Sequence, residues 1–435
     1  MLGTVEERQT PVDKLSTAIM TDEIDRQTQM PPEVAHHEIP TPRQLNAICD
    51  PVARFPFDIS SEIFIQCLHS RPSPGALDAP MLFLNICHAW TDIALSTTKL
   101  WASIHVDRPL LHLASLLGAW FERAGSRALS ISLLWTKHYL RLLRSGERSN
   151  LTDAIAAVIS RHAQKIQELR IFYCEDDIEL VAGAGPFPLL KTLTIDRGMA
   201  LWEISSKVPI MGILRLCPNL VEFTFNGSIC GNDKSTELLV LPHLRQLTFA
   251  VLEFGGIPWY ITSDARFLQY ISAPHLETLY SPPCSSGLDA LIPFFRRSSP
   301  PLRMLSLGSL VTPLNWTGKE TRECLSLLPN LAHLELVQCK PLTAQALVTI
   351  LANSPEVVPN LSSISLSDAD PGFPAPWYRR LLSTLLSRRE EIKTVRVILD
   401  HRTVLDPPQN MLAALRQLVA DGMSIHIGTE RYNYV

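Results

Sequence analysis

Residues 329–336 read Pro-Asn-Leu-Ala-His-Leu-Glu-Leu, and this segment carries the pattern that decides the fold of the chain. Leu334 and Leu336 alternate with polar residues, which is the period-2 spacing of a β-strand with one buried face. Proline disfavours the helical conformation in the residue before it, so the segment starts at a break in any helix. The pattern therefore predicts a turn followed by a strand, in preference to the competing interpretation of a helical bundle.

The same pattern recurs along the chain at a nearly regular interval. Its first apolar position falls at Ile166, Leu190, Leu220, Leu244, Leu276, Leu302, Leu331, Leu361 and Ile392. The mean interval is about 28 residues, which is similar to the longer leucine-rich repeats, whose units each supply a parallel strand and a helix. The copy at residues 331–347 resembles the cysteine-containing repeats, because Cys339 follows its strand. The other copies lack this residue, so we expect an irregular array.

Segments between the copies have the spacing of helices. Apolar residues recur at helical intervals in residues 343–352, 378–388 and 411–420, and Asp421-Gly422 is a typical helix stop. A single strand–helix unit cannot bury its apolar side alone, whereas stacked neighbours form a continuous core. We therefore predict an α/β fold over residues 165–435, an irregular leucine-rich-repeat solenoid with parallel strands and outer helices.

A second pattern lies upstream, in residues 55–101. It comprises Phe55-Pro56-Phe57-Asp58-Ile59, then Ile63-Phe64, and after a proline-rich break Ile86-Cys87-His88-Ala89-Trp90 and Leu100-Trp101. These spaced half-motifs resemble the fungal-type F-box, a three-helix module that docks a protein onto the Skp-type adaptor of cullin–RING ubiquitin ligases. The resemblance implies that the adaptor-binding unit is formed by Phe55, Pro56, Asp58, Ile59, Ile63, Phe64, Ile86, Trp90, Leu100 and Trp101.

The residues of this upstream region also have a purely structural interpretation. Ile59 and Ile63 recur at helical spacing, and further helices are expected from about Pro80 and from about Thr91. These apolar side chains would then be the ordinary core of a small helical domain. A helical unit of this size has little core of its own, however, so a partner surface is also expected.

The chain divides into four predicted regions. Residues 1–44 are polar and proline-containing and are expected to be a disordered tail, and a short helix is expected at residues 44–48. Residues 45–106 form the F-box-like helical domain. Residues 107–164 are interpreted as a linker and capping segment, with a helix near 109–123 and a strand near 129–133. The repeats occupy residues 165–435.

The concave face of such repeats is the second candidate site. Positions three, five and seven of each copy, for example Thr192, Thr194 and Asp196, are expected to face solvent there. Most residues at these positions are small and uncharged, so a solvated surface without a ligand is an equally good interpretation. The residues selected as candidate substrate-binding positions are Glu222, Tyr280, His333, Glu335 and Arg396.

Composition excludes several classes of function. Apolar residues make up 46% of the chain, and the net charge of −4 comes without a basic tract, so neither nucleic acid nor an anionic membrane is an expected partner. The nine cysteines include no Cys-x-x-Cys pair, which favours a reducing compartment. No secretory signal and no apolar run long enough to span a bilayer occurs. We expect a cytoplasmic or nuclear protein.

No catalytic motif is present. The phosphate-cradling, nucleophile-elbow and zinc-protease patterns are all missing, and Cys217 beside Pro218 has the position of a structural residue. We expect a protein that is not an enzyme and has no catalytic residue, cofactor or metal. The expected function is substrate recognition in an SCF-type cullin–RING E3 ligase, with a Skp-type adaptor and an unknown protein substrate as partners. The alternative is a leucine-rich-repeat interaction scaffold without a ligase role.

Overall fold

The computed structural model describes residues 50–107, 112–134, 145–173, 184–197, 210–226, 237–249, 253–254, 257–258, 265–281, 290–308, 317–337, 339–369, 373, 375–399, 408–429 and 431–435. Two compact units are present. Unit 1 runs to His105 and includes Glu122–Arg127, and unit 2 contains Val106–Phe121 and Ala128–Val435. The expected tail at residues 1–44 and the expected helix at residues 44–48 lie outside the described residues.

Unit 1 contains two α-helices and three 3-10 helices in its described part. They are η1 (Val52–Arg54), α3 (Phe57–Gln66), η2 (Met81–Asn85), α4 (His88–Ser96) and η3 (Thr98–Trp101). The helix predicted from Pro80 is therefore a short 3-10 segment, and the helix predicted from Thr91 begins earlier, at His88. The expectation of three α-helices is corrected to two α-helices joined by 3-10 turns.

Aromatic packing holds unit 1 together. The rings of Phe64 and Phe83 stack at 4.3 Å, and Trp90 lies 4.8 Å from Phe64. The buried indole of Trp101 donates a hydrogen bond of 2.9 Å to the Ala94 carbonyl. Since α3 contributes only Ser60 and Phe64 to this core, most of the apolar surface of α3 is left outside it.

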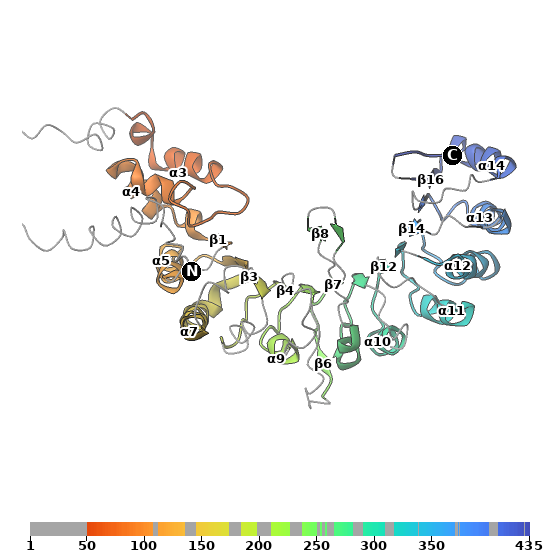
Figure 1. Cartoon of the computed structure of the whole chain (residues 1–435), viewed down its shortest axis with the longest axis horizontal. Helices are drawn as coiled ribbons and strands as arrows, with labels where there is room; N and C mark the ends of the chain where they lie inside the picture. Colours follow the sequence, from red (N-terminus) through yellow and green to blue (C-terminus); the bar gives the residue numbers. More distant parts are fainter. Residues whose placement is uncertain are drawn as a thin grey trace, which may run out of the picture. The chain divides into compact units, whose positions relative to one another are not determined.

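Unit 2 is built on a long sheet (Figure 1). In the described part of the chain the sheet has twelve strands, in the order β1-β2-β3-β4-β5-β7-β11-β12-β13-β14-β15-β16, of which β2 to β16 belong to unit 2. The bounds are β1 (Ser103–Val106), β2 (Leu129–Leu134), β3 (Ile166–Tyr173), β4 (Thr192–Arg197), β5 (Glu222–Asn226), β7 (Gln246–Phe249), β11 (Thr278–Ser281), β12 (Met304–Gly308), β13 (His333–Val337), β14 (Ser363–Ala369), β15 (Thr394–Leu399) and β16 (Ser424–Gly428). Neighbours from β2 to β16 pair in parallel.

Helices connect most of these strands and lie along one side of the sheet (Figure 1). They are α5 (Leu113–Arg123), α7 (Ser145–His162), η4 (Ala163–Lys165), α9 (Ile210–Arg215), η5 (Ala265–Tyr270), α10 (Leu291–Ser298), α11 (Gly318–Ser326), α12 (Pro341–Asn353), α13 (Ala375–Ser387) and α14 (Gln409–Ala420). Short strands replace helices near the middle, where β6 (Leu239–Val240) pairs with β10 (Ile271–Ser272). A small hairpin joins β8 (Glu253–Phe254) to β9 (Ile257–Pro258).

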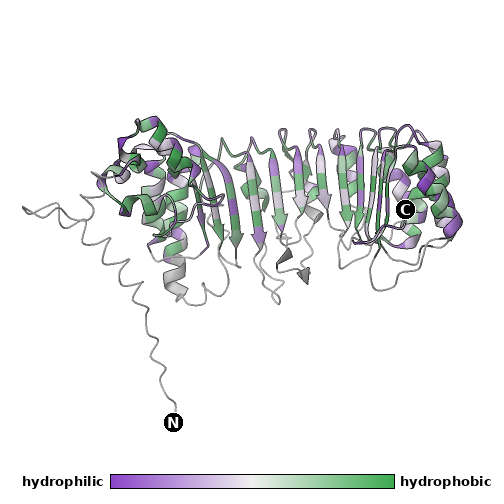
Figure 2. Cartoon of the chain, turned by 90° about the horizontal axis from the view of Figure 1, so that it is seen from above, coloured by the Kyte–Doolittle hydropathy of each residue, from purple (hydrophilic) through white to green (hydrophobic). Residues whose placement is uncertain are grey.

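Strand register aligns the apolar side chains in continuous rows. One buried row runs through Ile131, Leu169, Leu193, Phe223, Leu247, Leu279, Leu305, Leu334, Ile364, Val395 and Ile425. Hydrophobic and hydrophilic residues accordingly alternate along the strands in Figure 2. Each fully buried Leu, Ile or Phe contributes roughly 1.5–3 kcal/mol, so these rows are the main source of cohesion between neighbouring strands.

Side chains link several turns before strands to the turn of the preceding strand–helix copy. In the Pro-Asn-Leu segments, the Asn219 amide donates to the Pro188 carbonyl at 2.8 Å and the Asn360 amide donates to the Pro329 carbonyl at 3.0 Å. The buried Arg388 guanidinium donates to the carbonyls of Val357 and Val358. The Arg388 bonds satisfy backbone acceptors that would otherwise be buried without partners, whereas the two Asn bonds join neighbouring turns near the surface.

The predicted α/β class and the parallel strand order are confirmed. Apart from Ile166, which starts β3, every predicted first apolar position lies two residues before a strand. The predicted helices at residues 343–352, 378–388 and 411–420 correspond to α12, α13 and α14. Residues 107–164, interpreted as a linker and cap, contribute α5, β2 and α7, and β2 pairs with β3. The last strand, β16, was not predicted because glycine rather than proline precedes it.

Replacing Arg388 by methionine should reduce the free energy of unfolding by about 2–4 kcal/mol, because two buried carbonyls and Glu391 lose their donor. Denaturant unfolding measures the change. The matched control is Arg389→Met, which removes an exposed ion pair of 3.4 Å with Asp421 and should cost under about 1 kcal/mol. Equal losses in the two variants would contradict the assigned role of Arg388.

The C-terminal residues cover the free edge of β16. Gly428 forms an antiparallel bridge with Asn433, and the Tyr434 amide donates to the Ile427 carbonyl at 2.9 Å. The Asn433 side chain accepts from the Ile427 amide at 2.9 Å and donates to the Ile425 carbonyl. A Cβ at Gly428 would overlap the Tyr432 carbonyl. An open strand edge is a template for pairing with another chain, and this segment occupies it.

Asn433→Ala should loosen this segment and expose the edge of β16. We expect the variant to associate in a concentration-dependent manner and to lose about 1–2 kcal/mol of stability, because the part-buried hydrogen bonds of Asn433 to Ile425 and Ile427 are lost. Sedimentation velocity over a concentration series measures the association. The control is Asn410→Ala on the exposed surface of α14; a sedimentation profile for Asn433→Ala that matches both the control and the wild type would contradict the assignment.

Candidate functional site

An exposed apolar strip marks unit 1. Phe55, Phe57 and Ile59 are 48%, 52% and 47% exposed, and Pro56 and Asp58 between them are also exposed. Ile63 follows one helical turn after Ile59 and is half-buried. We call residues 55–59 with Ile63 the α3 strip. Large exposed apolar side chains grouped on one short segment are typical of a protein-binding surface.

The remaining residues of the F-box-like pattern divide into two groups. Phe64, Leu100 and Trp101 are fully buried, so the expectation that Phe64 faces a partner is corrected: its ring packs against Phe83 and Trp90. Ile86 and Trp90 are half-buried. These side chains therefore pack within unit 1, as expected if they form the core of a small helical domain. The α3 strip, in contrast, points outward.

Unit 2 presents one sheet face that its helices do not cover, which we call the open face. Two rows of side chains line it across neighbouring strands. The first row is Ser130, Glu168, Thr192, Glu222, Gln246, Thr278, Met304, His333, Ser363, Thr394 and Ser424; the second is Ser132, Arg170, Thr194, Thr224, Thr248, Tyr280, Ser306, Glu335, Ser365, Arg396 and His426.

The five candidate residues of the repeats all lie in these two rows. Glu222 lies on β5, Tyr280 on β11, His333 and Glu335 on β13, and Arg396 on β15. Successive members of this series are two strands apart, which corresponds to about 10 Å at a strand spacing of about 4.8 Å. Glu222, His333 and Arg396 are exposed, and Tyr280 and Glu335 are half-buried. The structure therefore spreads the five candidates along the open face, and of these only His333 and Glu335 share a strand.

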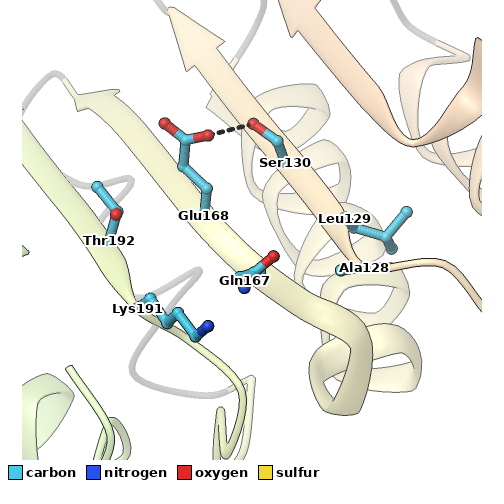
Figure 3. A pocket seen from close by; sticks show the side chains of 7 residues that line it. All are labelled: Ala128, Leu129, Ser130, Gln167, Glu168, Lys191 and Thr192. Carbon is cyan, nitrogen blue, oxygen red and sulfur yellow. Dashed lines mark hydrogen bonds between the residues drawn. The ribbon is translucent and has the colours of Figure 1, made fainter. Parts of the chain in front are cut away.

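A shallow pocket of about 230 Å³ opens at the start of β2, β3 and β4 (Figure 3). Its lining consists of Ala128, Leu129, Ser130, Gln167, Glu168, Lys191 and Thr192. The Ser130 hydroxyl donates to Glu168 at 2.7 Å, and Arg170 forms an ion pair of 2.6 Å with the same carboxylate. Sequence reasoning missed this pocket, because its residues come from three strands and no single copy of the pattern marks them.

Asp196 and Asn226 were expected to face solvent at position seven of their strands, and this expectation is wrong. Both side chains are buried, and the Asn226 amide donates to Asp196 at 3.0 Å. Burial raises the pKa of Asp196 to about 7, although the Asn226 hydrogen bond acts in the opposite direction. The sequence does contain a signal for this contact: Asp196 and Asn226 occupy the same position in successive copies, so parallel strands place them side by side.

The buried thiols are expected to be unreactive. Burial raises the pKa of Cys217, Cys324 and Cys339 to about 12 in each case. Since the thiolate is the reactive form, these groups remain protonated near neutral pH and pack as small apolar side chains. The structural interpretation of Cys217 is consistent with its burial and its bond of 3.3 Å to the Ile213 carbonyl.

Within the described residues, no group of three or more His, Cys, Asp or Glu side chains could hold a metal ion. None of the described helices has both the length and the hydropathy of a membrane-spanning segment.

Comparison with known proteins returned no match. The chain matches no protein-family model, and no curated protein is similar to it at the threshold of the search. The α3 strip and the open face, with the chemistry of their residues, are therefore the features that bear on function.

Asp196→Asn should remove a pH dependence of stability. Because the folded-state pKa of Asp196 is raised from 3.8 to about 7, the folded protein retains a proton that the unfolded chain releases, and stability falls as pH rises from about 4 to about 7. The variant should gain a few kcal/mol relative to wild type at pH 8, at about 1.4 kcal/mol per pKa unit, and little at pH 4.5. Denaturant unfolding at both pH values measures this; an identical difference at the two values would contradict it.

Proposed function

We propose that the chain is the substrate-recognition subunit of an SCF-type cullin–RING E3 ubiquitin ligase, in which unit 1 docks the Skp-type adaptor. The observation that carries this proposal is the α3 strip. Phe55, Phe57 and Ile59 occupy the positions of the F-box-like motif and stand about half exposed. Their exposure is unfavourable in water and is relieved when a partner covers them.

Burial energies give the scale of this docking. Full burial of a Phe or Ile side chain contributes roughly 1.5–3 kcal/mol, so covering the exposed halves of these three contributes about 2–5 kcal/mol. The buried aromatic cluster of Phe64, Phe83 and Trp90 supports α3 from behind. A strip held on a packed helix loses little conformational entropy on binding, which favours affinity.

Unit 2 is proposed to be an irregular leucine-rich-repeat solenoid that presents a protein substrate on its open face. Support comes from the regular register of parallel strands and from the interval of about 28 residues between copies. The candidate binding residues lie along this face: Glu222, Tyr280, His333, Glu335 and Arg396. The subunit performs no chemistry of its own; it holds the substrate near the charged enzyme and raises the effective concentration.

The double variant Pro56→Asp, Ile59→Asp should abolish binding of the full chain to the purified Skp-type adaptor. Two charges would be placed within a surface that becomes buried, so the affinity should fall at least about 100-fold. Titration calorimetry measures the affinity, and thermal unfolding shows that unit 2 remains folded.

Leu77→Asp is the control for this experiment. Leu77 is 85% exposed in unit 1 but lies outside the motif, so the variant should bind like wild type. Unchanged adaptor binding by the double variant would exclude the α3 strip as the docking surface. Failure of the wild-type chain to bind any Skp-type adaptor would favour the alternative, a repeat-based scaffold without a ligase role.

A further inference from the structure

Glu335 is held in a fixed position on the open face. Ser306 on β12 donates to its Oε2 atom at 2.8 Å, and Ser367 on β14 donates to its Oε1 atom at 3.3 Å. The two donors come from the strands on either side of β13, so both carboxylate oxygens are oriented before any ligand binds. Each oxygen still has a free lone pair, because a carboxylate can accept about four hydrogen bonds.

Glu335 has no counter-ion within the described part of the chain. Other glutamates there do: Glu168 pairs with Arg170, Glu323 with Arg296 and Glu356 with Arg322. The chain segments after β11 to β14 that fall outside the described residues are 282–289, 309–316, 338, 370–372 and 374. Their sequences contain no lysine or arginine, so they supply no cationic partner either.

The surroundings of Glu335 suit the stem of a long side chain. On β12, Ser306 lies between Glu335 and Tyr280, and Met304 lies in the neighbouring row, between Thr278 and His333. The Tyr280 hydroxyl contacts Met304 Sδ at 3.2 Å. Tyr280 and Glu335 are two strands apart, or about 10 Å along the same row. Lysine and arginine cover apolar surface with their methylene stems while the charged head stays polar.

We propose that Glu335 is the receptor for a basic side chain of the bound polypeptide, with Tyr280 and Met304 packing against the stem of that side chain. The inference rests on the proposed role of the open face in substrate binding and names the substrate class, a segment with an accessible arginine or lysine. Arginine is favoured over lysine, because its planar guanidinium can donate two parallel bonds to an oriented carboxylate.

The test is a selection of phage-displayed random dodecapeptides on the immobilised full-length chain. Four proteins are compared: wild type, Glu335→Gln, Glu335→Lys and the control Glu356→Gln, which removes a carboxylate on the helix side. Arginine and lysine should be enriched among peptides retained by wild type and control. The enrichment should be lost on Glu335→Gln and replaced by Asp and Glu on Glu335→Lys. The best basic peptide should bind Glu335→Gln at least tenfold more weakly by fluorescence anisotropy.

Equal enrichment of basic residues on wild type and on Glu335→Gln would overturn the inference, as would a wild type that retains no peptide. Thermal unfolding confirms that the isosteric Gln variant is folded. Each protein is also titrated with the Skp-type adaptor, whose binding depends on the α3 strip. If wild type binds the adaptor but shows no enrichment of basic peptides, the role of Glu335 alone is refuted. If wild type does not bind the adaptor, the proposed function is refuted.

Discussion

Parallel, in-register pairing of successive strands is the constraint on which the rest of unit 2 depends. A strand of four to eight residues with its connecting helix has one apolar side and cannot bury it alone. Register places Leu305 beside Leu334 and Leu334 beside Ile364, so each strand–helix copy completes the core of the next copy. The same register fixes which polar side chains meet on the open face. A shift of one residue would exchange the two faces.

Polar side chains stabilise the turns and the edge of this stack. Arg388 donates to two buried carbonyls of the preceding turn, and Asn219 and Asn360 donate to turn carbonyls near the surface. The edge strand β16 would expose unpaired backbone groups, and the segment around Asn433 covers them. Asp196 is a different case, because its carboxyl is buried against Asn226 and its pKa is raised to about 7. It costs stability at neutral pH.

The two candidate surfaces differ in their physics. The α3 strip of unit 1 is apolar, so its affinity would come from the area covered and its specificity from shape. The open face of unit 2 is mostly hydroxyl-bearing, and in the proposed function its specificity would depend on a few charged side chains such as Glu335 and Arg396. Buried or oriented charges discriminate strongly between partners because an unpaired charge is costly. Under this proposal one unit would supply the docking surface and the other the selective surface.

Local spacing in the sequence was enough to predict strands β2 to β15 of the main sheet and the helices α5 and α12 to α14, because period-2 and helical spacing are local properties of the chain. It also marked the residues that became the α3 strip. Which apolar residues of that motif are core and which are exposed was decided only by tertiary packing, as Phe64 shows beside Phe57. The burial of Asp196, the pocket at Glu168 and the serines that hold Glu335 likewise depend on contacts between residues about 30 or more positions apart. Local spacing carries no information about such contacts until the register of the sheet is known.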